Sequence, residues 1–400
     1  MSTSGFSKAR LHRMQDNLER HVESGFAPGV VTLVARGTEI HVDVIGAQAF
    51  GGAPMQRDTL FRISSMTKPV TAVATMILVE ECVLRLDEPV DTFLPELANR
   101  TVLRAPDAPL HDTVPAKRAI TLRDLLTFRA GYGFYFGPSV HESVTKAIDA
   151  LELKFGAPKP RTPHTPDEWM RRLGTLPLVH QPGEQWRYGT GSELLAVLVA
   201  RASGKSFEDF LRERIFEPLG MKDTFFTVPA EERHRLATSY WALSADKPVA
   251  IYDSVEDSQW NTPPPFPSGS AGLVSTADDF FAFARMLMNG GKDGNTSILS
   301  RASVETMTTD QLTPEQKALS PFAGLWDDHG WGFGVSIATK RTDLYKIPGR
   351  YGWDGGLGTA WANDPKERMV GIMLSQRAGF PSQNPLYLDF WTSAYQAIED

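Results

Sequence analysis

FRISSMTKPV, residues 61–70, carries the clearest indication of fold and chemistry in this 400-residue chain. It places Ser65 three residues before Lys68, where a long apolar run begins. On a helix, residues at positions i and i+3 share a face, so the two side chains can lie side by side. The pair is either a catalytic nucleophile with its base or two ordinary polar residues on a first helical turn.

The surroundings of this pair separate it from its repeats, because Ser-x-x-Lys occurs at Ser65/Lys68, Ser143/Lys146 and Ser244/Lys247. Ser65 is expected at a helix N-terminus, where free N–H groups favour developing negative charge. Pro69 suits the first turn of that helix. The apolar run VTAVATMILVEECVL predicts a buried helix, and burial lowers the pKa of a lysine. The other two pairs lie in polar surroundings typical of a solvated surface.

The composition is that of a large globular protein with 42% hydrophobic residues, enough for two lobes or one large domain. The net charge of -7, without a stripe of lysine and arginine, argues against nucleic acid as a partner. The single cysteine, Cys82, continues an apolar helical pattern, so we expect it to be a small buried hydrophobe.

The location of the protein is predicted from two absences in the sequence. The N-terminal residues have no apolar core of a secretory signal. No apolar run reaches the length of a membrane span. We therefore expect a cytoplasmic protein without a membrane partner.

Strand patterns lie near both ends of the chain, and helical patterns fill the middle. GVVTLVARGTEIHVDVIGA, at 29–47, is typical of a hairpin. Further strands are predicted at 331–339, 358–364 and 368–376, whereas the polar stretch 229–268 looks irregular. The fold class predicted is α+β, with one antiparallel sheet flanked by terminal helices and a helical lobe inserted. The predicted domains are 1–90 with 291–400 (α/β) and 91–290 (helical), with the active site at their interface.

Two distant stretches could complete a site around Ser65. In QPGEQWRYGTGSELLAVL, at 181–198, Tyr188 stands on a loop at a helix entry, a good position for a proton shuttle. GWDGGLGTAW, at 352–361, is rich in glycine and could bring backbone N–H groups close to a ligand. The plainer interpretations are a packed aromatic residue and a tight strand connection.

Signatures of other enzyme classes are missing from the sequence. There is no G-x-S-x-G elbow, no H-E-x-x-H and no G-x-G-x-x-G. The GKS at 204–206 lacks the glycine of a phosphate-binding loop, because Val199 stands there. No metal site and no cofactor are predicted.

Taken together, Ser65-Met66-Thr67-Lys68, Tyr188-Gly189-Thr190 and Trp353-Asp354-Gly355-Gly356 resemble the three motifs of the serine β-lactamase and penicillin-binding-protein superfamily. Within it, the chain looks most similar to the class C β-lactamase-like esterases known as family VIII carboxylesterases. Supporting stretches include IFEPLGMKDTFF, SGSAGLVSTADDF and HGWGFGV, and the resemblance runs from about residue 10 to the end.

The resemblance implies roles for individual residues. Ser65 would be the acylated nucleophile, and Lys68 would accept its proton or hold Tyr188 as a phenolate. Tyr188 would protonate the leaving alkoxide and later activate water. The N–H groups of Ser65 and Gly356 would form the oxyanion hole. Which of Lys68 and Tyr188 is the base stays open, since coupled groups titrate as a pair.

Departures from the lactamase pattern shift the expected substrate toward esters. Trp353-Asp354-Gly355 stands where lactamases have Lys-Thr-Gly, so an apolar wall replaces a cation that would attract a carboxylate. Thr190 replaces an asparagine suited to amides. The predicted substrate-binding residues are Trp353, Asp354, Gly355, Thr190, Phe134 and Tyr135.

The predicted function is a serine carboxylesterase that hydrolyses small to medium neutral esters through an acyl-enzyme on Ser65. A β-lactamase, amidase or acyltransferase using the same residues is the alternative, and an inactive ligand-binding protein is a more remote one. The expected partner is a small-molecule ester, and the oligomeric state stays open.

Overall fold

The structure is a computed structural model that describes residues 5–134, 142–153, 162–242, 249–320, 322, 324–379 and 384–399. Tyr135 and the Ser244/Lys247 pair lie outside the described residues.

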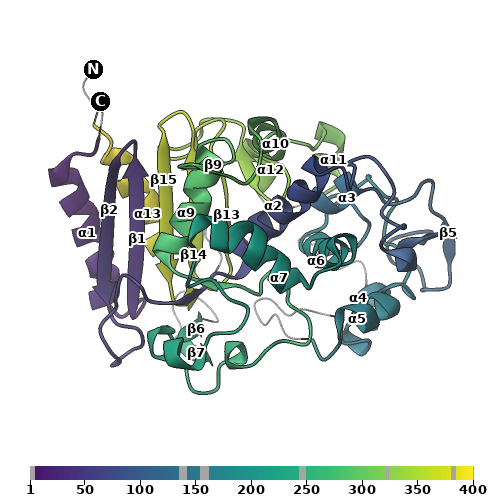
Figure 1. The fold of residues 1–400 in the computed structure, drawn as a ribbon, viewed down its shortest axis with the longest axis horizontal. Coiled ribbons are helices and arrows are strands. Elements are labelled where there is room, and N and C mark those ends of the chain that lie inside the picture. Colours follow the sequence, from purple (N-terminus) through teal and green to yellow (C-terminus); the bar gives the residue numbers. More distant parts are fainter. Residues whose placement is uncertain are drawn as a thin grey trace.

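Both ends of the chain build one antiparallel sheet of seven strands (Figure 1). The strands, in spatial order, are β11 (His329–Trp331), β12 (Ser336–Ala338), β13 (Tyr351–Gly355), β14 (Thr359–Asp364), β15 (Met369–Ser375), β1 (Gly29–Arg36) and β2 (Glu39–Gly46). The α+β architecture predicted from the sequence is therefore confirmed.

The β1–β2 hairpin forms as its alternation predicts, and its turn places Gly37 at a left-handed φ of 62°. β1 is buried along its whole length, because helices cover both sheet faces. Val30 and Val34 face a core with α1 (Lys8–Glu23) and α13 (Pro385–Gln396), which lie side by side in Figure 1. Val31 and Leu33 face the core on the other side.

The second face of the sheet carries α9 (Ala277–Met288), which packs on β15, β14 and β1. The predicted domain boundary placed this helix in the helical lobe. The boundary itself stays a prediction, but the sheet-facing layer includes residues from the middle of the chain. Thr276 caps α9 by accepting the N–H of Asp279.

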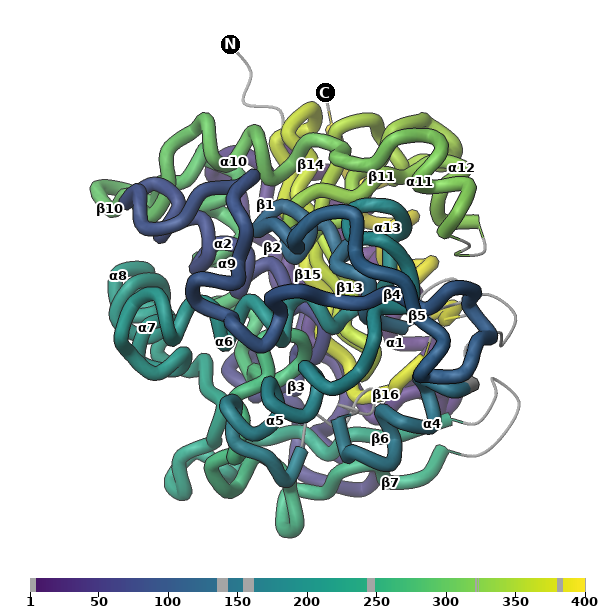
Figure 2. The backbone as a smooth tube through the Cα atoms, turned by 90° about the vertical axis from the view of Figure 1, so that its right-hand side faces the viewer, coloured from purple at the N-terminus to yellow at the C-terminus, as the bar shows by residue number. Residues whose placement is uncertain are grey.

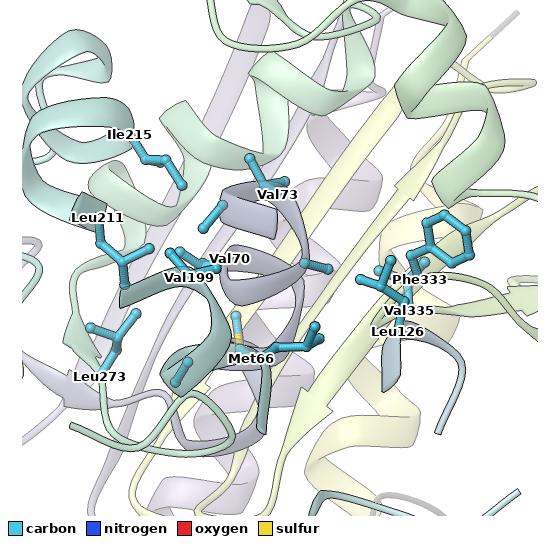
Figure 3. Close-up of a cluster of buried hydrophobic side chains, with 14 of the residues drawn as sticks. Met66, Val70, Val73, Leu126, Val199, Leu211, Ile215, Leu273, Phe333 and Val335 are labelled. Atoms are coloured by element: carbon cyan, nitrogen blue, oxygen red, sulfur yellow. The ribbon is translucent and has the colours of Figure 1, made fainter. Parts of the chain in front are cut away.

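The helical lobe surrounds α2 (Thr67–Glu80), whose residues are buried from Thr67 through Leu78. Figure 3 shows Val199 and Leu211 on one side of α2, with Leu126, Phe333 and Val335 on the other. Further helices of the lobe are α3 (Leu122–Leu126), α4 (Glu142–Ala150), α5 (Pro166–Leu173), α6 (Thr190–Ser203), α7 (Phe207–Leu211) and α8 (Glu217–Leu219). Figure 2 looks onto this lobe, with the sheet behind it.

The remaining elements are short. The helical ones are η1 (Ser64–Met66), η2 (Pro95–Leu97), η3 (Arg212–Phe216), η4 (Ala230–Arg235), η5 (Gln259–Asn261), α10 (Arg301–Met307), α11 (Pro314–Ala318) and α12 (Leu325–Asp328). The extended ones are β3 (Phe61–Arg62), β4 (Thr101–Leu103), β5 (Thr113–Pro115), β6 (Ser239–Ala242), β7 (Val249–Asp253), β8 (Val274–Ser275), β9 (Lys292–Asp293), β10 (Thr296–Ser297) and β16 (Arg377–Ala378).

Three sequence predictions of local structure were wrong. The strand predicted at 331–339 is a turn and a strand, because Gly334 at φ 73° reverses the chain between β11 and β12. The stretch 229–268 contains the β6–β7 pair, which β16 extends in parallel. Cys82 is exposed, because α2 ends at Glu80 and Cys82 adopts a left-handed φ of 58° in the following turn.

Among the described residues, no helix combines the length and the apolar character that crossing a membrane requires.

Candidate active site

Ser65 lies at the point where β3 leads through η1 into α2. Ser64 just before it adopts a φ of 46°, a region that a serine rarely occupies. Such local strain is held by the surrounding structure and is common beside functional groups. In the fully described run from 59 through 78, Ser65 is the one residue that is not buried. Ser65 is therefore more exposed to solvent than its neighbours in this stretch.

Lys68 places its amine against the Ser65 hydroxyl inside the protein. The side chain is 2% exposed, and Nζ donates to Ser65 Oγ at 2.9 Å and to the Ser270 carbonyl oxygen at 2.9 Å. Burial lowers the pKa of Lys68 to about 7, and the negative charge of Glu193 opposes that effect. An amine with this pKa can accept a proton near neutral pH.

Tyr188 reaches the same pair from the segment before α6. Its backbone pairs with Phe134 through two hydrogen bonds, Phe134 N to Tyr188 O at 2.8 Å and Tyr188 N to Phe134 O at 3.1 Å. Its hydroxyl accepts from Trp353 Nε1 at 2.8 Å, and its ring centroid lies 4.4 Å from Lys68 Nζ. Burial raises the pKa of Tyr188 above its usual range, although hydrogen bonds with Ser65 and Trp353 act the other way. Tyr188 is therefore a proton donor at neutral pH.

An aromatic wall stands around Tyr188. The rings that contact one another here, within 4.7–6.4 Å between centroids, are Phe128, Trp186, Tyr188, Trp331 and Trp353. Trp331 and Trp353 meet edge to face at 4.7 Å. The side of the site beyond Tyr188 is therefore apolar.

The end of β13 lies against the residues before Ser65. A Cβ added to Gly355 would stand 2.3 Å from the carbonyl oxygen of Ile63, so only glycine allows this approach. Gly356 follows in the β13–β14 turn, and a Cβ added there would meet nothing within 4 Å. Among the described residues, the N–H groups of Ser65 and Gly356 donate to no other group. Neither N–H group is therefore occupied by another acceptor, and their role in an oxyanion hole stays a prediction.

The other predicted binding residues are placed differently. Asp354 alternates with Trp353 along β13 and accepts from the Tyr387 hydroxyl of α13 at 3.1 Å, so its carboxyl does not join the Ser65 group. Burial raises the pKa of Asp354 to about 7. Thr190 is half-buried as the first residue of α6, and Phe134 is exposed beside Gly189.

Sequence reasoning missed two participants in the site. The Ser270 carbonyl oxygen binds Lys68, and the carboxyl of Glu193 is buried in α6 at 2% exposed. A glutamate inside the otherwise apolar GTGSELLAVLV was a usable signal for the second. Ser270 contributes only a backbone atom, so nothing in its residue type indicated the contact. Across the described stretches, no three carboxylate, imidazole or thiol groups come together as a metal site requires.

A buried lysine hydrogen-bonded to an accessible serine, on an α+β fold of this topology, defines a serine hydrolase of the β-lactamase-like fold. The sequence matches the Beta-lactamase family over residues 14–390, and the chain belongs to that family.

The chain is also similar to three known proteins. It is 39% identical to protein Rv1367c of Mycobacterium tuberculosis over 371 residues, which are 90% of this chain and 89% of that protein. It is 30% identical to the lovastatin esterase of Penicillium rubens over 339 residues, 80% of each chain. The solved structure of EstCE1, described as a hydrolase with promiscuous acyltransferase activity, has the same fold, with a TM-score of 0.79, 24% identity and coverage of 97% of this chain and 99% of that one.

Proposed function

We propose that this protein is a carboxylesterase that hydrolyses neutral carboxylic esters through an acyl-enzyme on Ser65. The observation that carries the proposal is the 2.9 Å hydrogen bond from buried Lys68 to the accessible Ser65 hydroxyl. A lysine with a pKa lowered to about 7 suits a general base at neutral pH. The similarity to an esterase of Penicillium rubens supports the same reaction class.

Acylation would begin with attack of Ser65 Oγ on the ester carbonyl while the hydroxyl proton passes to Lys68 Nζ. The N–H groups of Ser65 and Gly356 would stabilise the negative charge of the tetrahedral intermediate. The intermediate then collapses, the bond to the alkoxide breaks, and Tyr188 donates its hydroxyl proton to that alkoxide. The proton that Lys68 took from Ser65 then passes to the Tyr188 phenolate, so the alcohol leaves neutral.

Deacylation would use the same groups in the opposite direction. A water molecule takes the place of the departed alcohol beside Tyr188 and Lys68. It loses a proton to this pair as it attacks the acyl carbonyl, and Ser65 leaves as a hydroxyl. The carboxylic acid is released, and the proton count returns to its starting value.

The aromatic wall supports an apolar substrate. Trp353 occupies the place where related lactamases carry a lysine, and it donates to Tyr188 instead of presenting a cation. Phe128, Trp186 and Trp331 form a buried apolar cluster behind it. A neutral ester with a hydrophobic acyl or alcohol part fits this environment better than an anionic lactam.

Labelling with an ethyl fluorophosphonate, followed by peptide mass spectrometry, tests the nucleophile. We expect one adduct, on the peptide that holds Ser65, and loss of p-nitrophenyl butyrate hydrolysis in proportion to labelling. Label on another residue, or none at all, would overturn the assignment. Turnover of p-nitrophenyl esters above turnover of nitrocefin then distinguishes an esterase from a lactamase.

Acyl transfer to an alcohol is the second candidate reaction. It is favoured by the apolar wall and by the fold shared with EstCE1, a hydrolase with promiscuous acyltransferase activity. Hydrolysis of a vinyl ester in the presence of 1-butanol measures the partition. A butyl ester formed faster than the free acid would make transfer the principal reaction.

A further inference from the structure

A turn between α2 and α6 links the amine of Lys68 to a carboxyl that the proposed reaction does not use. The Ser268 hydroxyl donates to Glu193 Oε1 at 2.7 Å, and two residues later the Ser270 carbonyl accepts from Lys68 Nζ at 2.9 Å. Thr71 of α2 donates to the Gly269 carbonyl between them at 2.7 Å. Ser268, Gly269 and Ser270 are thus hydrogen-bonded to side chains of α6 and α2.

The packing of this turn leaves it little freedom. A Cβ added to Gly269 would stand 2.4 Å from the Ser192 carbonyl oxygen and 2.9 Å from the Ala196 side chain. Ser268 is 1% exposed, and its oxygen also accepts from the N–H of Ala271 at 3.0 Å. The hydroxyl that holds Glu193 therefore has its own orientation determined by the backbone.

Glu193 is the carboxylate whose charge acts on Lys68, although no ion pair joins the two groups directly. Within the described residues, Glu193 Oε2 is buried and has no hydrogen-bond partner. A buried carboxyl held through one oxygen alone is costly as an anion, unless a nearby cation balances it. Burial raises the pKa of Glu193 to about 7. The Ser268 hydroxyl, the positive charge of Lys68 and the backbone N–H groups of Gly269 and Ser270 oppose this rise, and both groups titrate in the same pH range.

The other groups around Lys68 do not replace this charge. In the described structure, η1 and the 268–271 turn offer hydroxyl and carbonyl groups, the segment before α6 offers Tyr188, and β13 offers Asp354, whose charge acts on Tyr188. α7 also packs on α2, but its Glu208 and Asp209 are exposed.

We propose that Glu193 is a positioning residue for the Lys68 base: its carboxyl, held by Ser268, shares one proton with the Lys68 amine and determines the pH at which that amine can accept the Ser65 proton. The role of Lys68 as base rests on the function proposed above. The charge balance between the two side chains does not, because it follows from their burial and placement.

The test is Glu193→Gln, measured in two ways. In protein labelled with [ε-¹³C]lysine, the Lys68 signal, assigned by its absence in Lys68→Met, reports the amine directly. Without the carboxylate the ammonium is less stable, so we expect the titration midpoint of Lys68 to fall by about one pH unit. The limb of the kcat/KM profile that Lys68 controls should move to lower pH by the same amount.

Matched variants separate charge from packing. Glu193→Asp keeps the charge and should stay nearer the wild-type midpoint. Ser268→Ala weakens the hold on the carboxylate and should shift the midpoint the same way by less, which also covers a Glu193→Gln protein that does not fold. Asp279→Asn removes another buried carboxyl, one held by Thr224, and should leave Lys68 unchanged.

An unmoved or raised Lys68 midpoint in folded Glu193→Gln would overturn the proposal. The result is independent of the reaction, because the NMR titration needs no turnover. Failure of fluorophosphonate to label wild-type Ser65 would instead overturn the proposed function, and the midpoints would still decide the role of Glu193.

Discussion

Two Ser-x-x-Lys pairs stand on helices of this protein, and their surroundings differ completely. Ser65 and Lys68 lie at the start of α2, with the lysine buried and bonded to the serine. Ser143 and Lys146 lie in α4, where the Ser143 hydroxyl donates to the Ala108 carbonyl at 2.9 Å and Lys146 is exposed. Identical spacing thus gives a buried lysine bonded to its serine in one place and an exposed lysine in the other.

The comparison shows that desolvation of the lysine, more than the Ser-x-x-Lys spacing, distinguishes the Ser65/Lys68 pair. In α2 the apolar helix removes water from the amine, and the turn at 268–270 supplies the acceptors that water would have supplied. In α4 the lysine remains in water, where an ammonium is at its most stable. Parallel substitutions at the two pairs test whether this difference determines activity.

The largest effect is expected for Ser65→Ala, set beside Ser143→Ala. Without the nucleophilic oxygen no acyl-enzyme forms, so kcat for p-nitrophenyl butyrate should fall by at least about 10⁴-fold. Ser143→Ala should retain the wild-type rate. Equal rates for the two variants would show that the α2 pair is not the reactive one.

Lys68→Met, compared with Lys146→Met, should have the next largest effect. Methionine fills a buried site of similar shape but accepts no proton, so kcat should fall by about 10³-fold. Thermal unfolding measured alongside shows whether the loss is chemical, because removal of a buried amine need not destabilise the fold. An active Lys68→Met protein would transfer the role of base to Tyr188.

Tyr188→Phe tests the phenol that lies beside the Ser65/Lys68 pair. Loss of the proton to the leaving alkoxide should lower kcat by about 100-fold. The loss should be smaller for p-nitrophenyl esters than for alkyl esters, since p-nitrophenoxide leaves without being protonated. The same loss for both ester types would contradict a role in protonating the alcohol.

The smallest change is expected for Trp353→Phe. It removes the N–H that donates to Tyr188 at 2.8 Å while keeping an aromatic ring. One hydrogen bond corresponds to a loss of about threefold to tenfold in kcat. Because this hydrogen bond lowers the pKa of Tyr188, the basic limb of the kcat profile should move to higher pH in the variant. A limb that moves to lower pH would show that Trp353 acts on another group.

Structural features that depend on neighbouring residues could be predicted from the sequence. The β1–β2 hairpin and the burial of Lys68 each follow from residues near one another, and each was predicted. Periodicity does not indicate the positive φ of Ser64, and the hairpin at 329–338 was missed because no turn was predicted at Gly334.

The candidate site divides in the same way. Ser65, Lys68 and Tyr188 are brought together as the motifs indicated. Asp354 was assigned by its place in a motif, yet strand alternation turns it toward Tyr387. Glu193 and the Ser270 carbonyl act through a turn whose position only the packed helices determine.

The position of β1 in the sheet affects how the protein folds during synthesis. β1 pairs with β2 on one side, but its other neighbour, β15, is formed by residues 369–375, far along the chain from β1. During synthesis the β1–β2 hairpin therefore keeps one edge unpaired until residues 369–375 have been made. Such an edge is a template for association with other nascent chains.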